Sequence, residues 1–254
     1  MLFRSVIAAA PPSLPAYFAH FCNLQGDKEF IVDGSHRYTF RQVYAEARIV
    51  AGGLVDGHKL QKGERVGIAA RNSANWIVAY MAILMAGGCA VLLNGFWSGE
   101  ELVHGIDLVG CRIVLADKPR ADRLAHLSHG AQVLPLLHDC PPQEGLASLL
   151  AHGGGGDTPL PTLIGDDLAT VLYTSGSTGA SKGAWSDHRG VVQGTFNYLA
   201  QSVMVLGLLT ERGEAPAEGS QPIALVNVPL FHVTGEVPVF LQSFALGRSE
   251  DTRL

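Results

Sequence analysis

The segment with the most evident chemistry lies at residues 173–183, where the chain reads Tyr-Thr-Ser-Gly-Ser-Thr-Gly-Ala-Ser-Lys-Gly. It places three glycines, five aliphatic hydroxyl side chains and one lysine directly after an apolar run of strand length. Glycines let backbone N–H groups turn inward at positive φ, hydroxyls add donors, and a lysine supplies a full positive charge. This combination predicts a cradle for a polyphosphate, although composition alone would equally allow a flexible Gly/Ser turn.

The segment is not a Walker A loop, which needs Gly immediately before the lysine and Ser or Thr after it. Here Ser181 precedes Lys182 and Gly183 follows it. The segment instead resembles the phosphate-binding signature Y-T-S-G-[ST]-T-G-x-P-K-G of the adenylate-forming superfamily. That superfamily includes acyl-CoA synthetases, peptide-synthetase adenylation domains and firefly luciferase. Ser181 stands where the family usually has Pro, and Asp187 opens an Asp-His-Arg stretch that is similar to the family's Thr-His-Arg and provides a suitable helix N-cap.

A second resemblance lies at residues 228–235, whose sequence Val-Pro-Leu-Phe-His-Val-Thr-Gly is similar to the family's P-L-F-H-x-x-G stretch. In the family this histidine belongs to the acyl pocket and gates it, so the resemblance gives that role to His232. Without the motif, a histidine in an apolar run is more often a satisfied core or surface residue. The triplet Thr234-Gly235-Glu236 imitates a ribose-binding Thr-Gly-Asp, but it overlaps the acyl-pocket motif and is given no role.

A third, weaker match lies at residues 81–93, and the resemblance as a whole spans residues 30–247. It implies that the complete enzyme lets the carboxylate of a fatty acid or another organic acid attack the α-phosphate of Mg²⁺-bound ATP, giving an acyl-adenylate and pyrophosphate. The acyl group then passes to a thiol, expected to be CoA. Lys182, which would stabilise the departing pyrophosphate, and His232 are the expected catalytic residues. The residues expected at the β- and γ-phosphates are Thr174, Ser175, Gly176, Ser177, Thr178, Gly179, Lys182 and Gly183.

The family's later motifs, which bind adenine, ribose and Mg²⁺ and carry a catalytic lysine on a mobile lid, do not occur in the chain. After Gly247 a charged string at 248–254 stands where the family has an apolar strand. We therefore expect the N-terminal part of a longer ligase, ended by a natural truncation, a frameshift or an experimental boundary, and inactive alone. Two alternatives stay open: a non-catalytic fragment that keeps the core of the fold, and a peptide-synthetase-type adenylation domain.

The bulk composition limits the remaining classes. A chain of 254 residues with 47% apolar and 16% charged residues can bury a sizeable core. A net charge of -5 gives no basic field for nucleic acid, so small-molecule partners are expected. The histidines other than His232 lack ligand spacing on a common element, so no metal site is expected from them. Buried thiols in a reducing compartment are predicted for Cys22, Cys89, Cys111 and Cys140.

Two segments bear on targeting. Residues 1–16 contain one arginine and an apolar run that is too short for a secretory signal, which favours a cytoplasmic protein. The uncharged segment 76–93 is long enough to suggest a membrane span. Its Gly87-Gly88 pair is more typical of a helix C-cap followed by a buried strand, so no transmembrane span is expected and a membrane protein is the weakest alternative.

Alternating helix and strand patterns predict an α/β fold class: the N-terminal part of the adenylate-forming enzyme fold, incomplete, with mixed and parallel sheets flanked by helices. Capping boxes predict helix starts at Thr39 with Gln42 and at Ser98 with Glu101. The expected elements are a hairpin over 30–40, a helix through residue 54, strands over 65–70, 89–93, 112–116, 132–137 and 168–174, and helices over 76–86 and 121–128.

Proline and glycine divide the chain into predicted units. Residues 139–167 are rich in both and hostile to regular elements, which favours a linker or surface excursion. The expected organisation is a first α/β subdomain over 1–138, then this linker. The start of a second α/β subdomain over 168–254 follows and carries the phosphate-binding loop.

Overall fold

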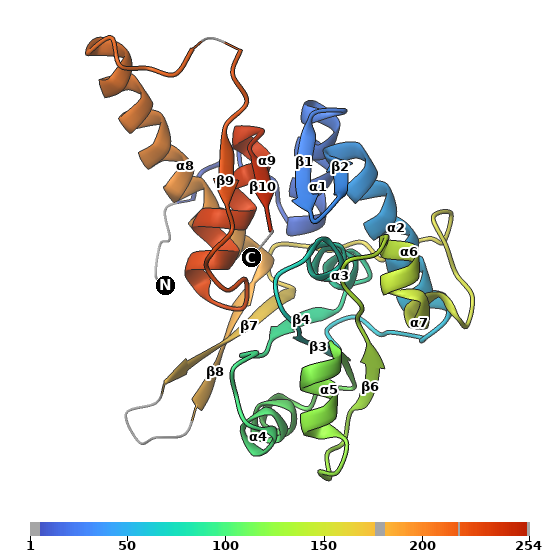
Figure 1. Ribbon diagram of the computed structural model, residues 1–254. Helices are drawn as coiled ribbons and strands as arrows, with labels where there is room; N and C mark the ends of the chain where they lie inside the picture. Colours follow the sequence, from blue (N-terminus) through green and yellow to red (C-terminus); the bar gives the residue numbers. More distant parts are fainter. Residues whose placement is uncertain (1–5, 176–180, 218, 253–254) are drawn as a thin grey trace.

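The computed structural model describes residues 6–175, 181–217 and 219–252, and it contains two sheets surrounded by helices (Figure 1). The predicted α/β fold class is confirmed. The larger sheet has the strand order β6-β5-β3-β4-β7-β8, and the smaller sheet has the order β2-β1-β10-β9. The strands are β1 (Glu29–Asp33), β2 (His36–Thr39), β3 (Arg65–Ala69), β4 (Cys89–Leu92), β5 (Ile113–Ala116), β6 (Gln132–Pro135), β7 (Leu168–Ser175), β8 (Ser181–Asp187), β9 (Ile223–Leu225) and β10 (Ser249–Asp251).

Most pairs of the larger sheet are parallel, and β8 forms its edge as the antiparallel partner of β7. Parallel strands need crossover connections, which α3 supplies between β3 and β4 and α4 supplies between β4 and β5. Because these connections are right-handed and run in opposite directions across the sheet, the two helices cover opposite faces. The carboxyl ends of β3, β4 and β7 therefore meet at one edge, where ligands bind in open α/β sheets.

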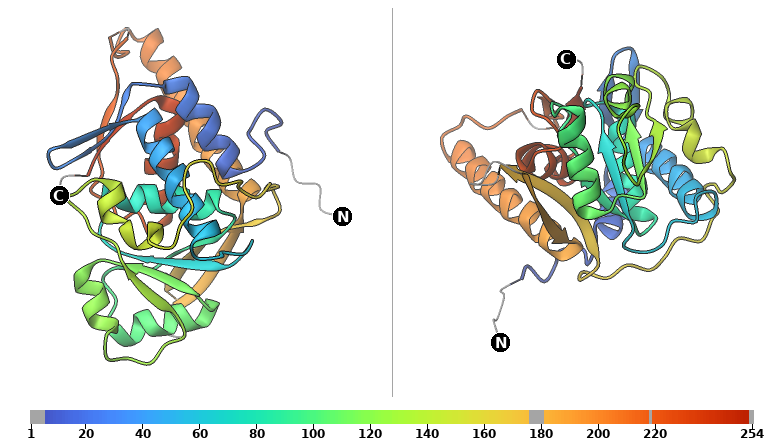
Figure 2. Two further views of the ribbon diagram at one scale, coloured as in Figure 1. Left: turned by 90° about the vertical axis from the view of Figure 1, so that its right-hand side faces the viewer. Right: turned by 90° about the horizontal axis from the view of Figure 1, so that it is seen from below.

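Alternate side chains of β4 pack into two different apolar cores, as expected of a strand buried on both faces. Ala90 and Leu92 belong to the core that contains α3, whereas Val91 belongs to a second core with Leu102 of α4, as does Leu93 just after the strand. The helices α4 and α5 lie together at the end of the molecule away from the smaller sheet (Figures 1 and 2). The helices are α1 (Leu14–Gln25), α2 (Phe40–Asp56), α3 (Ala74–Met85), α4 (Gly99–Val109), α5 (Lys118–Leu124), α6 (Pro142–Gly145), α7 (Ala147–Leu150), α8 (His188–Glu211), the π-helix η1 (Gly235–Leu241) and α9 (Gln242–Leu246).

Local sequence signals set several of these boundaries as predicted. Both capping boxes form, at the starts of α2 and α4, and the Asp187 carboxylate accepts the Gly190 N–H at the start of α8. The Asp33-Gly34 pair joins β1 and β2 in an antiparallel hairpin. Every residue of α3 is buried, which explains the uncharged stretch of sequence. Within the described residues no helix is long and apolar enough to cross a membrane.

Two expectations about regular elements need correction, and one strand was missed. The helix predicted over 121–128 is α5, which starts earlier because Asp117 caps it and Pro119 fits its first turn. The strand β8 was not predicted, because its alternation of small polar residues resembles a loop. The segment 139–167, expected to lack regular elements, contains the short helices α6 and α7, and α7 packs on α2. Its role as a linker or surface excursion stays a prediction.

The expectation that the charged string after Gly247 replaces a strand is also wrong, because residues 249–251 form strand β10 between β1 and β9. Ser249 and Glu250 are buried, and Arg248 pairs with the Glu250 carboxylate at 2.7 Å. Backbone pairing on both sides stabilises this polar strand, so its lack of apolar residues did not indicate the absence of a strand. Strands from 168–254 join strands from 1–138 in both sheets, and the proposed subdomain boundaries stay a prediction.

Burial of the cysteines is confirmed for three of the four. Cys22, Cys89 and Cys111 are buried free thiols, and burial raises the pKa of each to about 12, so these thiols stay protonated at neutral pH. Cys140 is only partly buried, since it lies in the irregular segment beside α6 rather than in a sheet or helix. Its thiol lies 3.8 Å from the Asn75 amide.

Candidate functional site

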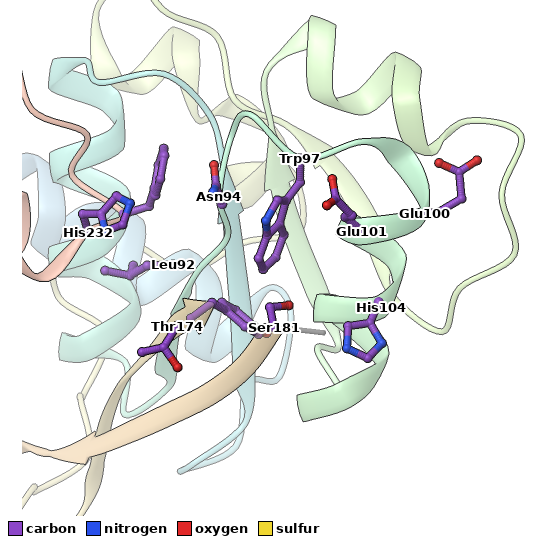
Figure 3. Close-up of a pocket in the computed structure, with 11 residues that line it drawn as sticks. Leu92, Asn94, Trp97, Glu100, Glu101, His104, Thr174, Ser181 and His232 are labelled. Carbon is purple, nitrogen blue, oxygen red and sulfur yellow. The ribbon is translucent and has the colours of Figure 1, made fainter. Parts of the chain in front are cut away.

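A cleft of about 570 Å³ opens at the carboxyl ends of β4 and β7 (Figure 3). Its walls come from the β7–β8 hairpin, from α4 with the loop before it, and from the segment that precedes η1. The two sequence motifs at 173–183 and 228–235 therefore meet at one cavity. The residues that line it are Leu92, Asn94, Trp97, Glu100, Glu101, His104, Tyr173, Thr174, Ser181, Phe231 and His232.

The hairpin wall is the end of β7 and the start of β8, which pair as an antiparallel ladder. Lys182 is the cross-strand partner of Thr174, so both side chains lie on the same face of the hairpin. Thr174 and Ser181 line the cleft. Lys182 is exposed, and its ammonium group has no hydrogen bond or ion pair with any residue in the described ranges. Among the described residues, the hairpin thus presents a cation without a partner, next to a residue that lines the cleft.

The expected loop is wrong for Ser181, Lys182 and Gly183, because all three lie on β8. Gly183 lies on the other face of the hairpin, where an added Cβ would be 3.2 Å from methyl groups of Val109 and Val171. This glycine therefore lets β8 pass close to α4. The other residues expected at the phosphates, Gly176, Ser177, Thr178 and Gly179, lie outside the described residues, and Ser175 is the last residue of β7.

The α4 wall is fixed to β7 through Tyr173 and Trp97. The Tyr173 hydroxyl donates a hydrogen bond to the Gly105 carbonyl oxygen at 2.5 Å, and the Tyr173 and Trp97 rings pack edge to face at 5.0 Å. Burial raises the pKa of Tyr173 well above its usual range, so this hydroxyl remains a donor at neutral pH. Glu101 lines the cleft, but its carboxylate accepts the Ser98 N–H of the capping box.

The third wall carries His232, whose exposed imidazole packs beside Phe231 with ring centroids 5.3 Å apart. Asn72, just after β3, clamps the start of this segment. Its amide donates to the carbonyl oxygens of Val226 and Val228, and its Oδ1 accepts the Leu230 N–H at 3.0 Å. His232 therefore sits at the cleft because a residue more than 150 positions earlier holds its backbone there.

Several residues of this site were not identified from the sequence. Asn72 and Asn94 directly follow the strand regions of β3 and β4, so the rule that ligands bind beyond the carboxyl ends of parallel strands would have found both. Trp97 and Phe231 carry no such signal, because an aromatic residue is more often part of a core. The structure brings Thr174 and His232 to the same cleft and puts Lys182 next to Thr174.

Comparison with known proteins identifies the family. The AMP-binding enzyme family matches residues 18–249, and the chain belongs to this family of adenylate-forming enzymes. The chain is 30% identical over 212 residues to 4-coumarate–CoA ligase-like 3 of Oryza sativa subsp. japonica, covering 78% of this chain and 34% of that protein. It is 25% identical to the long-chain-fatty-acid–CoA ligase of Salmonella typhimurium, covering 87% of this chain and 43% of that protein.

Solved structures support the fold. The inhibitor-bound N-terminal domain of FACL13 from Mycobacterium tuberculosis aligns with a TM-score of 0.75 at 20% identity, covering 95% of this chain and 57% of that chain. The N-terminal subdomain of Klebsiella oxytoca NpsA, in complex with 3-hydroxybenzoyl-AMSN, aligns with a TM-score of 0.72 at 18% identity, covering 95% and 54%. The chain therefore has the fold of N-terminal domains of adenylate-forming enzymes, and it spans less than half of the curated relatives that it matches.

Proposed function

We propose that this chain supplies the phosphate-binding wall and part of the acyl-binding wall of an ATP-dependent acid–thiol ligase. The complete enzyme would convert a carboxylic acid to its acyl-adenylate and pass the acyl group to CoA. One observation carries the proposal: Thr174 and His232 line a single cleft at the carboxyl ends of parallel strands, and Lys182, the cross-strand partner of Thr174, has no ion pair within the described residues. The relatives, which are named as CoA ligases, support the choice of reaction.

The described residues fit the triphosphate of ATP. An ammonium group without a partner can bind a phosphate oxygen without first breaking an ion pair, and the Thr174 hydroxyl adds a neutral donor on the same face. When bound, ATP supplies the activated phosphorus and the pyrophosphate leaving group. Lys182 would then hold the β- and γ-phosphates and neutralise the charge that grows on the departing pyrophosphate.

The described residues do not fit Mg²⁺ in the same way. The described residues contain no group of three or more His, Cys, Asp or Glu side chains that could hold a metal ion. The carboxylates nearest the cleft lie on α4, and that of Glu101 is engaged in a helix cap. We therefore assign none of the described residues to Mg²⁺ and derive no step through it.

The apolar and aromatic residues that line the cleft suit the acid. Leu92, Trp97 and Phe231 line the cleft together with His232, and Figure 3 shows Leu92, Trp97 and His232 among the side chains around it. Such a lining stabilises an apolar or aromatic acid body by burial and leaves the carboxylate near the polar hairpin. We propose that the substrate is a fatty acid or another organic acid of this apolar or aromatic type.

Binding of pyrophosphate to the chain tests the phosphate-binding role directly. Trp97 lines the cleft and Trp76 is buried, so a Trp185→Phe background leaves Trp97 as the tryptophan that responds to a ligand in the cleft. We expect saturable quenching on titration with pyrophosphate. Lys182→Ala should weaken binding by somewhat over tenfold, because a charge-assisted hydrogen bond contributes about 1.5 to 3 kcal/mol. Lys118→Ala, which removes an equal charge from α5, is the matched control.

Equal affinity in the two lysine variants would contradict the role of Lys182. A separate expectation concerns turnover: the chain alone should form no acyl-adenylate, since this wall by itself cannot orient a nucleotide for in-line attack. Carboxylate-dependent pyrophosphate exchange above the rate without enzyme would show that this expectation is wrong.

A further inference from the structure

A buried carboxyl group that the proposed chemistry does not use lies four residues after His232 in the chain. Glu236, the second residue of η1, is completely buried, and its Oε1 accepts a hydrogen bond of 2.7 Å from the equally buried Tyr80 hydroxyl. Burial raises the pKa of Glu236 to about 7, and the hydroxyls of Tyr80 and Thr170 limit the rise. Its other oxygen, Oε2, has no hydrogen bond of good geometry to any described residue.

This carboxyl connects the two walls that hold the sequence motifs. Tyr80 belongs to α3, while Thr170 belongs to β7, whose end carries Thr174 into the cleft. Glu236 itself follows the His232 segment, and its N–H donates to the His232 carbonyl oxygen at 2.8 Å. A displacement of Glu236 therefore passes to the backbone of His232 through one hydrogen bond.

The His232 segment has little freedom to absorb such a displacement. The His232 N–H donates to the Pro229 carbonyl oxygen at 3.1 Å, and a Cβ added at Gly235 would lie 2.1 Å from that same oxygen. In the middle of η1 stands Pro238, which lacks an N–H and is compatible with the wider π-helical turn. The segment is thus held tightly at its start, and the Tyr80–Glu236 hydrogen bond fixes its end.

We propose that Glu236 is a positioning residue: as a neutral carboxyl group it holds the His232 segment against α3 and β7, and as a carboxylate it releases that segment. This inference rests on the proposed function only for the role of the cleft; the hydrogen bond between Tyr80 and Glu236 does not depend on it. The physical reason is desolvation, since a carboxylate with hydroxyl donors alone around it gains by moving towards water. The titratable groups that act on Glu236 are Tyr80 of α3 and Cys89 of β4, and neither supplies a positive charge.

Hydrogen exchange at two pH values tests this inference on the chain as it exists. The reporter peptide is 229–241, and the control peptide is 118–135, in the second core of the protein. For wild type at about pH 8, relative to Glu236→Gln at the same pH, we expect exchange of the reporter peptide to be roughly threefold faster or more, with the control peptide unchanged. At about pH 5, where the carboxyl is neutral, the two proteins should exchange alike.

Two further variants keep the test decisive. Tyr80→Phe removes the hydroxyl and should speed exchange of the reporter peptide even at about pH 5, because the carboxyl loses its donor. Equal reporter exchange in wild type and Glu236→Gln at about pH 8, or faster exchange that includes the control peptide, would overturn the inference and leave Glu236 a general stability residue. Pyrophosphate binding is measured in parallel, so loss of the proposed function would be recognised separately.

Discussion

The hairpin wall and the His232 wall of the cleft are built in opposite ways. Thr174 and Lys182 are eight residues apart and are paired directly across one antiparallel ladder. His232 is placed by Asn72 from the end of β3 and by Tyr80 from α3, through Glu236. A local motif can thus be recognised in a sequence. For a wall assembled from distant elements, the sequence reveals the motif but not the distant residues that hold it in place.

The largest expected effect is a substitution in the His232 wall. Gly235→Ala would put a Cβ 2.1 Å from the Pro229 carbonyl oxygen, and both groups are backbone or close to it, so the segment must shift. We expect a loss of more than about 3 kcal/mol in the free energy of unfolding, the range of severe core strain. Chemical denaturation measures it.

The control for this substitution is Gly207→Ala in α8, where nothing lies within 4 Å of the added Cβ. It should be neutral or stabilising by up to about 1 kcal/mol, from helix propensity alone. Similar destabilisation in the two variants would mean that Gly235 is not under special constraint.

A second prediction concerns pH and Glu236. Its pKa is about 7 in the folded protein and near 4.5 when unfolded, so the folded state binds more protons between these values. Its contribution to stability is therefore fully present below about pH 4.5 and is lost as pH rises to about 7. The shift corresponds to up to about 3 kcal/mol. Urea denaturation of wild type and Glu236→Gln across this range measures the difference.

Glu250 is expected to contribute with the same sign, since burial raises its pKa to about 7 against the opposing effect of Arg248. Glu236→Gln should therefore flatten only part of the decline in stability, and the double variant with Glu250→Gln should flatten more of it. A decline that is identical in wild type and both variants would assign the pH dependence to other groups.

The third prediction has the opposite sign and concerns the start of α8. His188 is buried, its Nδ1 accepts the Leu14 N–H at 3.3 Å, and burial lowers its pKa to about 4. A protonated ring cannot accept this hydrogen bond. Its contribution is thus present above about pH 6.5 and lost as pH falls towards 4, by up to about 3 kcal/mol. His188→Asn should remove this acid-side loss in the same denaturation series.

These particular residues show how far the sequence could be used. Both capping boxes and the Asp33-Gly34 hairpin were predictable because each depends on side chains within a few residues of one another. The strand β10 was not, since its polar residues are held by backbone pairing with β1 and β9, which lie far away in the chain. Glu236 received no role for the same reason: its partner Tyr80 is 156 residues earlier.

The smallest expected effect is that of Lys182→Ala on stability. The side chain is exposed and has no partner among the described residues, so the free energy of unfolding should change by no more than about 0.5 kcal/mol. Thermal melts measure it. A clear fall in melting temperature would show that the hairpin wall depends on Lys182 for its structure and would remove the contrast with the His232 wall.

The central claim is that this cleft binds the phosphates of ATP through Lys182, and carboxylate-dependent pyrophosphate exchange tests it most directly. The measurement uses a longer protein in which residues 1–254 are followed by a matching C-terminal portion, with wild type, Lys182→Ala, Lys182→Arg and Lys118→Ala compared. We predict that Lys182→Ala lowers the specificity constant for ATP by somewhat over tenfold to about 150-fold. Lys182→Arg should recover part of the loss. Lys118→Ala should leave the specificity constant for ATP unchanged. Unchanged kinetics in Lys182→Ala, in a protein that turns over, would contradict the claim.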